Sequence, residues 1–141
     1  MREMSMPIAD DADRRVPRLM VTRITVFIAG ACLAIIGGAI LFAPRAFHAL
    51  NDITLPMDAS TLSEVRAPGA ALLVLGAGVL LGAFRPRHLR TSAALGAAVY
   101  LAYAGARVVS IALDGVPHEG LLQALAIELV AGAACLVAAR R

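Results

Sequence analysis

Four long apolar runs, separated by short polar segments, make up most of the chain. They cover residues 24–43, 67–84, 91–113 and 121–139. Each run is close to the roughly 20 residues that an α-helix needs to cross the hydrocarbon core of a bilayer. The pattern therefore predicts an all-α polytopic membrane protein, built as a bundle of four transmembrane helices.

The composition and the distribution of charge support this class and add an orientation. The chain is 60% hydrophobic, with a mean hydropathy of +0.78. Its basic residues are all arginines, and they form short clusters between the apolar runs rather than the continuous basic face of a nucleic-acid-binding protein. Ten of them fall before the first run, after the second or after the fourth, and only Arg45 and Arg66 fall on the other side. The positive-inside rule then predicts that both termini are cytoplasmic.

The chain is predicted to have two parts. Residues 1–23 are polar and include Pro7 and Pro17, which predicts a flexible cytoplasmic tail. Residues 24–141 form the membrane domain. Because the run 24–43 is longer than the apolar region of a signal peptide, we interpret it as a transmembrane helix and not as an export signal.

Small residues indicate where the helices pack. Gly30, Ala34 and Gly38 recur at intervals of four in the first run, and Gly78 and Gly82 do so in the second. Such stripes let helix backbones approach closely in a membrane. Residues 61–64, Thr-Leu-Ser-Glu, match a capping box, which predicts the start of the second transmembrane helix there.

Two charges lie inside the last two apolar runs. Arg107 lies about 9 Å and Glu128 about 12 Å from the outer ends of their helices, at a rise of 1.5 Å per residue. A short turn, residues 114–119, makes these helices antiparallel neighbours. Because an intramembrane charge normally has a partner, we predict that Arg107 and Glu128 pair.

The candidate site extends this pair to polar side chains on the same half of the bundle. Its members are Glu64, Arg66, Tyr100, Tyr103, Arg107, Asp114 and Glu128. One interpretation is an ion-pair network that holds the helices in register. The other is a ligand or proton site, with Arg107 binding an anionic group and Glu128 acting as the titrating acid.

No arrangement of residues predicts catalysis, a cofactor or a metal centre. Cys32 and Cys135 lie in separate apolar runs without a CxxC motif, and we interpret them as packing residues. His48 could bind an ion together with Asp52 or Asp58, but these residue types are ordinary in a solvated loop that is partly folded back as an interfacial helix. We therefore expect the protein not to be an enzyme.

Several short motifs resemble a known family, the small bacterial four-helix membrane proteins catalogued as domain of unknown function 4345. The resemblance covers residues 24–139 and departs at Pro68, where a second glycine would be expected. It implies a multi-pass inner-membrane protein with no agreed activity. The motifs are Glu64-x-Arg66, Arg107, Asp114-Gly115-x-Pro117 and Glu128.

Two functions follow as hypotheses. The first is a non-catalytic protein that associates with itself or serves as an accessory subunit in a larger membrane complex, with the lipid bilayer as its environment and no nucleic-acid partner. The alternative is a small-solute, lipid or proton binder or transporter that uses the buried Arg107-Glu128 cluster.

Overall fold

The structure is a computed structural model that describes residues 8–140, with side chains placed from residue 17 onward. Every element in this part of the chain is helical. The elements are α1 (Ile8–Phe42), α2 (Pro44–Ala49), α3 (Ala59–Phe84), the 3-10 turn η1 (Pro86–His88), α4 (Leu89–Asp114) and α5 (Glu119–Arg140).

Four of these helices are long and apolar enough to cross a membrane. The candidate spans are Pro17–Phe42, Ala59–Phe84, Pro86–Asp114 and Glu119–Arg140. The predicted all-α membrane fold with four transmembrane helices is therefore confirmed. The orientation of the termini stays a prediction.

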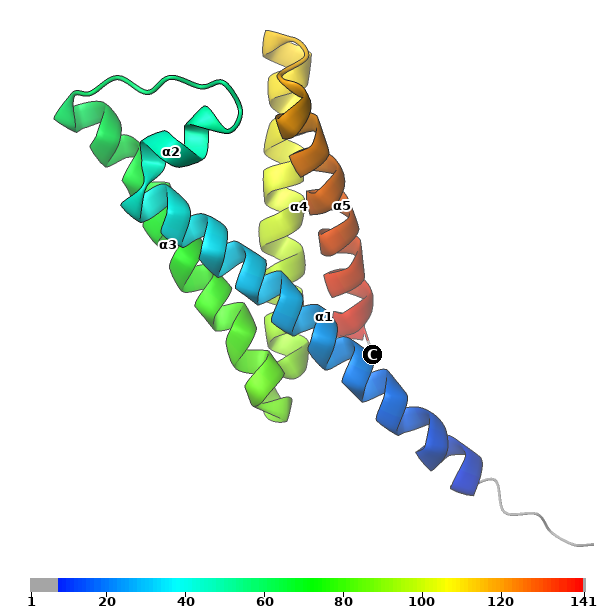
Figure 1. Ribbon diagram of the computed structural model, residues 1–141. Coiled ribbons are helices and arrows are strands. Elements are labelled where there is room, and N and C mark those ends of the chain that lie inside the picture. Colours follow the sequence, from blue (N-terminus) through cyan, green and yellow to red (C-terminus); the bar gives the residue numbers. More distant parts are fainter. Residues whose placement is uncertain (1–7, 141) are drawn as a thin grey trace, which may run out of the picture.

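The long helices form two antiparallel pairs, α1 with α3 and α4 with α5 (Figure 1). The pairs cross near the α3–α4 connection and diverge toward the end that carries α2 (Figure 1). We call that end, with residues 43–66 and 114–119, the loop end. The opposite end, with Arg18, Arg23, residues 85–90 and Arg140, is the arginine end.

Direct backbone contact joins α1 to α3. A Cβ atom added to Gly30 would lie 2.7 Å from the backbone nitrogen of Leu80, and one added to Gly69 would lie 2.8 Å from that of Leu41. A Cβ atom at Gly37 or Gly76 would also collide with the facing backbone. Van der Waals contact of this kind drives helix association in a bilayer, where lipid tails are as apolar as the side chains.

The contact face of α1 differs in one residue from the predicted stripe. Gly30 and Ala34 face α3 as predicted, but the third residue is Gly37, and a Cβ atom at Gly38 would meet nothing within 4 Å. A strict interval of four drifts around a helix of 3.6 residues per turn, so the face follows intervals of four and then three.

The junction of α3 with α4 uses the other predicted glycines. Gly82 lies against the side chain of Ser92, and the Oγ of Ser92 donates a hydrogen bond of 2.9 Å to the carbonyl oxygen of Gly78. The absence of side chains at both glycines lets a polar residue of α4 reach the α3 backbone. This bond satisfies the buried hydroxyl without water.

The predicted start of α3 is wrong by one turn. Asp58, rather than Thr61, is the N-cap, and its Oδ1 accepts a 2.8 Å hydrogen bond from the backbone N–H of Thr61. Aspartate is among the best capping residues, so the helix begins at the earlier of two available caps. Consequently Glu64 is not part of a capping box, and Pro68 lies inside α3 rather than in its first turn.

Helix α1 extends into the segment predicted to be a tail. It begins at Ile8 and includes Pro17, so residues 8–23 are helical, whereas residues 1–7 lie outside the described part of the chain. Adding residues to an existing helix costs much less free energy than nucleating one. The helix formed by the apolar run therefore continues into the polar sequence before it. The division of the chain at residue 24 is therefore not a helix boundary.

The glycine contact predicts an asymmetric effect of two neighbouring substitutions. We expect Gly37→Ala to destabilise the bundle by about 1–3 kcal/mol, because its Cβ would force the backbones of α1 and α3 apart. Gly38→Ala is the matched control, since open space surrounds that position. Unfolding in mixed micelles of mild detergent and sodium dodecyl sulfate measures both. Equal effects at the two positions would contradict the packing face.

The cap of α3 predicts a local dependence on pH. The hydrogen bond from Thr61 lowers the pKa of Asp58. The stabilisation that the charged cap provides is therefore present above the pKa of this carboxyl in the unfolded chain, and it is lost as pH falls through the lower pKa of the folded protein. We expect acidification to lower the protection of amide hydrogens against exchange in the first turn of α3, after correction for the intrinsic exchange rate, and to do so more than in Asp58→Asn, which keeps an uncharged cap. Identical pH profiles for the two proteins would refute this role.

Candidate functional site: an intramembrane ion pair

Arg107 of α4 and Glu128 of α5 form an ion pair within the membrane-spanning region. The Nε of Arg107 donates to both carboxylate oxygens of Glu128, at 3.0 Å to Oε1 and 2.9 Å to Oε2. The Glu128 side chain is 11% exposed and that of Arg107 is 27% exposed. The acid is thus nearly enclosed, and the arginine side chain is more exposed than its partner.

The α4–α5 hairpin brings these side chains to the same depth. Gly115, with φ of 95°, ends α4 in a conformation that glycine adopts easily, and α5 begins four residues later. Further along the hairpin, Gly132 packs against the side chains of Leu101 and Tyr100. A larger residue there would push the helices apart and separate the charges.

The geometry leaves the outer part of the guanidinium without a protein partner. Only Nε of Arg107 contacts Glu128, and among residues 17–140 no hydrogen bond joins its two terminal nitrogens to another group. No buried side-chain nitrogen or oxygen in this range lacks a partner, so these terminal nitrogens lie at accessible positions. They are the atoms of the pair that another molecule can reach.

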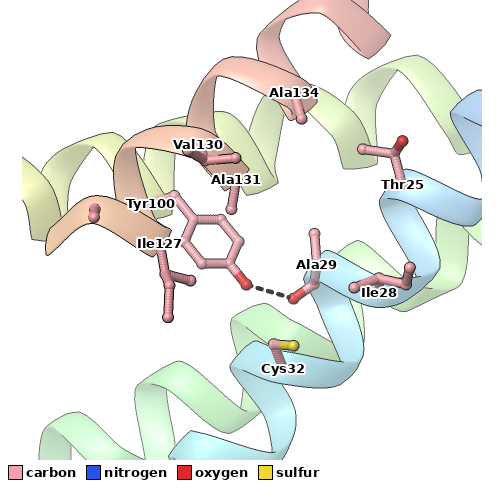
Figure 2. Close-up of a pocket in the computed structure, with 10 residues that line it drawn as sticks. Thr25, Ile28, Ala29, Cys32, Tyr100, Ile127, Val130, Ala131 and Ala134 are labelled. Carbon is pink, nitrogen blue, oxygen red and sulfur yellow. Dashed lines mark hydrogen bonds between the residues drawn. The ribbon is translucent and has the colours of Figure 1, made fainter. Parts of the chain in front are cut away.

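Tyr100 lies on the same face of α4 as Arg107, two turns away, but has a different partner. Its hydroxyl donates a 2.9 Å hydrogen bond to the carbonyl oxygen of Ala29 in α1 (Figure 2). Tyr100 is only 5% exposed. The bond therefore links the two helix pairs and satisfies a buried hydroxyl, but it does not extend the ion pair.

The other predicted members do not join Arg107 and Glu128. Glu64, Arg66 and Tyr103 are exposed on α3 or α4. Asp114 is exposed at the end of α4, where it accepts a 3.1 Å hydrogen bond from the Oγ of Ser110 on the same helix. The predicted cluster is thus one ion pair with separate polar side chains around it, and its role stays a prediction.

The loop end contains a contact that the sequence did not indicate. His118, before α5, lies 3.3 Å from Asp52 through Nε2, and its Nδ1 accepts a 3.1 Å hydrogen bond from the backbone N–H of Gly120. The other histidine at the loop end, His48 of α2, instead donates through Nδ1 to the carbonyl oxygen of Pro44 at 2.7 Å. Within residues 8–140, no group of three or more potential metal-ligating side chains occurs.

An apolar groove opens between α1 and α5, with Tyr100 as its floor (Figure 2). Its volume is about 480 Å³. Most of the residues around it are small or aliphatic, and neither Arg107 nor Glu128 lines it. The lining residues are Thr25, Ile28, Ala29, Cys32, Tyr100, Ala126, Ile127, Val130, Ala131 and Ala134.

Four helices able to span a membrane, two of them joined by an ion pair, define a small multi-pass membrane protein. The family whose model matches residues 21–139 is described as domain of unknown function DUF4345. Because the match covers most of the chain, the protein belongs to this family. The resemblance inferred from the motifs is therefore confirmed. No curated protein and no solved structure matches the chain.

The ion pair predicts strong coupling between its two members. We expect Arg107→Met or Glu128→Leu alone to cost about 3–5 kcal/mol of folding free energy, because each leaves a charge without its partner. The double variant should cost much less than the sum. Unfolding in mixed micelles measures the three variants, with Asp114→Asn as a control at an exposed acid. Additive effects would show that the pair does not stabilise the hairpin.

Proposed function

We propose that this protein works without catalysis, as a self-associating or accessory subunit of a membrane complex. The observation that carries this proposal is the groove between α1 and α5. It is open at the side of the bundle, it is apolar, and it is separate from the ion pair. It offers another membrane component an apolar surface to pack against, and no charged side chain among residues 17–140 lines it.

The residues along the groove favour a helix as its occupant. Ala29 of α1 and Ala126, Ala131 and Ala134 of α5 provide a surface with short side chains. Such surfaces allow close helix approach in a bilayer. Gly30, Gly37, Gly69 and Gly76 cannot serve this purpose, because they already lie in the contact between α1 and α3. We propose a transmembrane helix of a second copy as the first candidate partner.

The environment that fits this function is a bacterial inner membrane, with both termini in the cytoplasm. The supporting observation is the uneven distribution of arginine between the two ends. Among residues 17–140, six arginines lie at the arginine end, whereas Arg45 and Arg66 lie at the loop end. The positive-inside rule assigns the richer end to the cytoplasm.

The alternative, a binder or transporter that uses the pair Arg107-Glu128, has one supporting observation. The terminal nitrogens of Arg107 are accessible and free of protein partners among the described residues. Glu128, however, already neutralises the guanidinium, so an anionic ligand would meet a pair with no net charge. We therefore place this function second.

Native mass spectrometry from mild detergent tests the proposal. We expect an oligomer or a stable complex, and we expect Ala134→Trp to break it by filling the groove. Val74→Trp is the matched control, because Val74 is 71% exposed on α3, outside the groove. The mass of the species released from the detergent shows whether each substitution breaks the oligomer.

Two outcomes would contradict the proposal. A single monomeric species of the unaltered protein would remove the association on which it depends. A small bound molecule that is lost in Arg107→Gln, without any oligomer or partner, would favour the binder or transporter instead.

A further inference from the structure

The arginines of the arginine end divide into two groups by their contacts. The Nε of Arg23 donates to the carbonyl oxygen of Ala83 in the last turn of α3, at 3.1 Å. The Nε of Arg90 donates to that of Ala139 in the last turn of α5, at 3.2 Å. These two residues satisfy helix carbonyls that have no partner within their own helix, which is a structural task.

Arg85 and Arg87 have no such task. Both are exposed on the turn between α3 and α4, and the one side-chain hydrogen bond found for them runs from the Nε of Arg87 to the Nε2 of His88. Within residues 17–140, no carboxylate lies within ion-pairing distance of either guanidinium. The carboxylates of this range lie at the loop end or, as with Glu128, in the half of the bundle nearer to it.

The surface beside these guanidiniums is aromatic and exposed, and its residues belong to two candidate membrane spans. Phe84 and Phe27 meet edge to face, with ring centroids 6.0 Å apart, and they are 67% and 47% exposed. A recess of about 320 Å³ is lined by Phe84, Arg85, Pro86 and Arg87. Positive charge and an apolar surface therefore adjoin at the level where a spanning helix leaves the membrane.

We propose that Arg85 and Arg87 bind the phosphate headgroup of an anionic phospholipid, whose acyl chains lie along Phe84 and Phe27. Guanidinium groups suit phosphate because their N–H groups match its oxygen atoms. Basic residues beside a membrane surface also attract anionic lipids. A free phosphate ion would use the charge but would leave the aromatic surface unoccupied, and a zwitterionic lipid would bring its own cation to the arginines.

Lipid titration followed by native mass spectrometry tests this site, with phosphatidylglycerol and phosphatidylcholine as probes. We expect the unaltered protein to bind phosphatidylglycerol in preference. The double variant Arg85→Gln/Arg87→Gln should bind it roughly 10-fold to 30-fold more weakly, since each basic residue near an anionic surface contributes about a factor of five. Binding of phosphatidylcholine should not change.

The matched control is Arg45→Gln/Arg66→Gln, which removes the same charge from exposed positions at the loop end. We expect this control to bind phosphatidylglycerol as the unaltered protein does. An equal loss in both double variants would overturn the proposal, because it would show that net charge and not a site determines binding. Equal affinity for the two lipids would overturn it as well.

Two further measurements keep the result unambiguous. Arg85→Lys/Arg87→Lys retains the charge but not the planar guanidinium, so it should bind phosphatidylglycerol more tightly than the glutamine variant and more weakly than the unaltered protein. A folding defect in the glutamine variant would show as a change in its binding of phosphatidylcholine. Competition with inorganic phosphate distinguishes a lipid headgroup from a free phosphate ion as the ligand of this site. If inorganic phosphate displaces the lipid at equal concentration, the ligand is a free anion and the lipid assignment is wrong.

Discussion

The fold depends on one constraint: a polar group inside the bilayer has no water to bind and must find its partner within the protein. Glu128 meets this constraint by accepting hydrogen bonds from the Nε of Arg107 across the α4–α5 hairpin. Tyr100 meets it through the carbonyl oxygen of Ala29, and Ser92 through that of Gly78. Each partnership joins two different helices, so the same contacts that satisfy the polar groups also determine which helices are neighbours.

Close packing of helix backbones adds to the stability that these few polar contacts provide. The α1–α3 pair has no buried ion pair in the described part of the chain, and its backbones meet at Gly30, Gly37, Gly69 and Gly76 instead. The α4–α5 pair combines both means, since Gly132 lets the helices approach and Glu128 binds Arg107. The two helix pairs are therefore held together by different sets of contacts.

Much of this arrangement could be predicted, because it depends on composition and on spacing along a helix. The four spans follow from apolar length, and the proximity of Arg107 to Glu128 follows from their similar distances to a short turn. The start of α3 could not be predicted as reliably, because Asp58 and Thr61 are both good caps and their contacts decide between them. The bonds of Tyr100 to Ala29 and of His118 to Asp52 join distant segments, and no local pattern indicates such pairings.

The arginines show how one residue type can serve separate purposes that a charge count cannot distinguish. Arg23 and Arg90 bind helix carbonyls, and Arg107 binds a carboxylate inside the membrane. Arg85 and Arg87 are exposed beside an aromatic surface, with no carboxylate of residues 17–140 near them. Because the internal charges are already paired, the groups that remain free to contact other molecules lie mainly on the surface: the apolar groove of α1 and α5, and the guanidiniums of the α3–α4 turn. These two surfaces, rather than the interior ion pair, are where the proposed contacts with lipids and with other membrane helices would form.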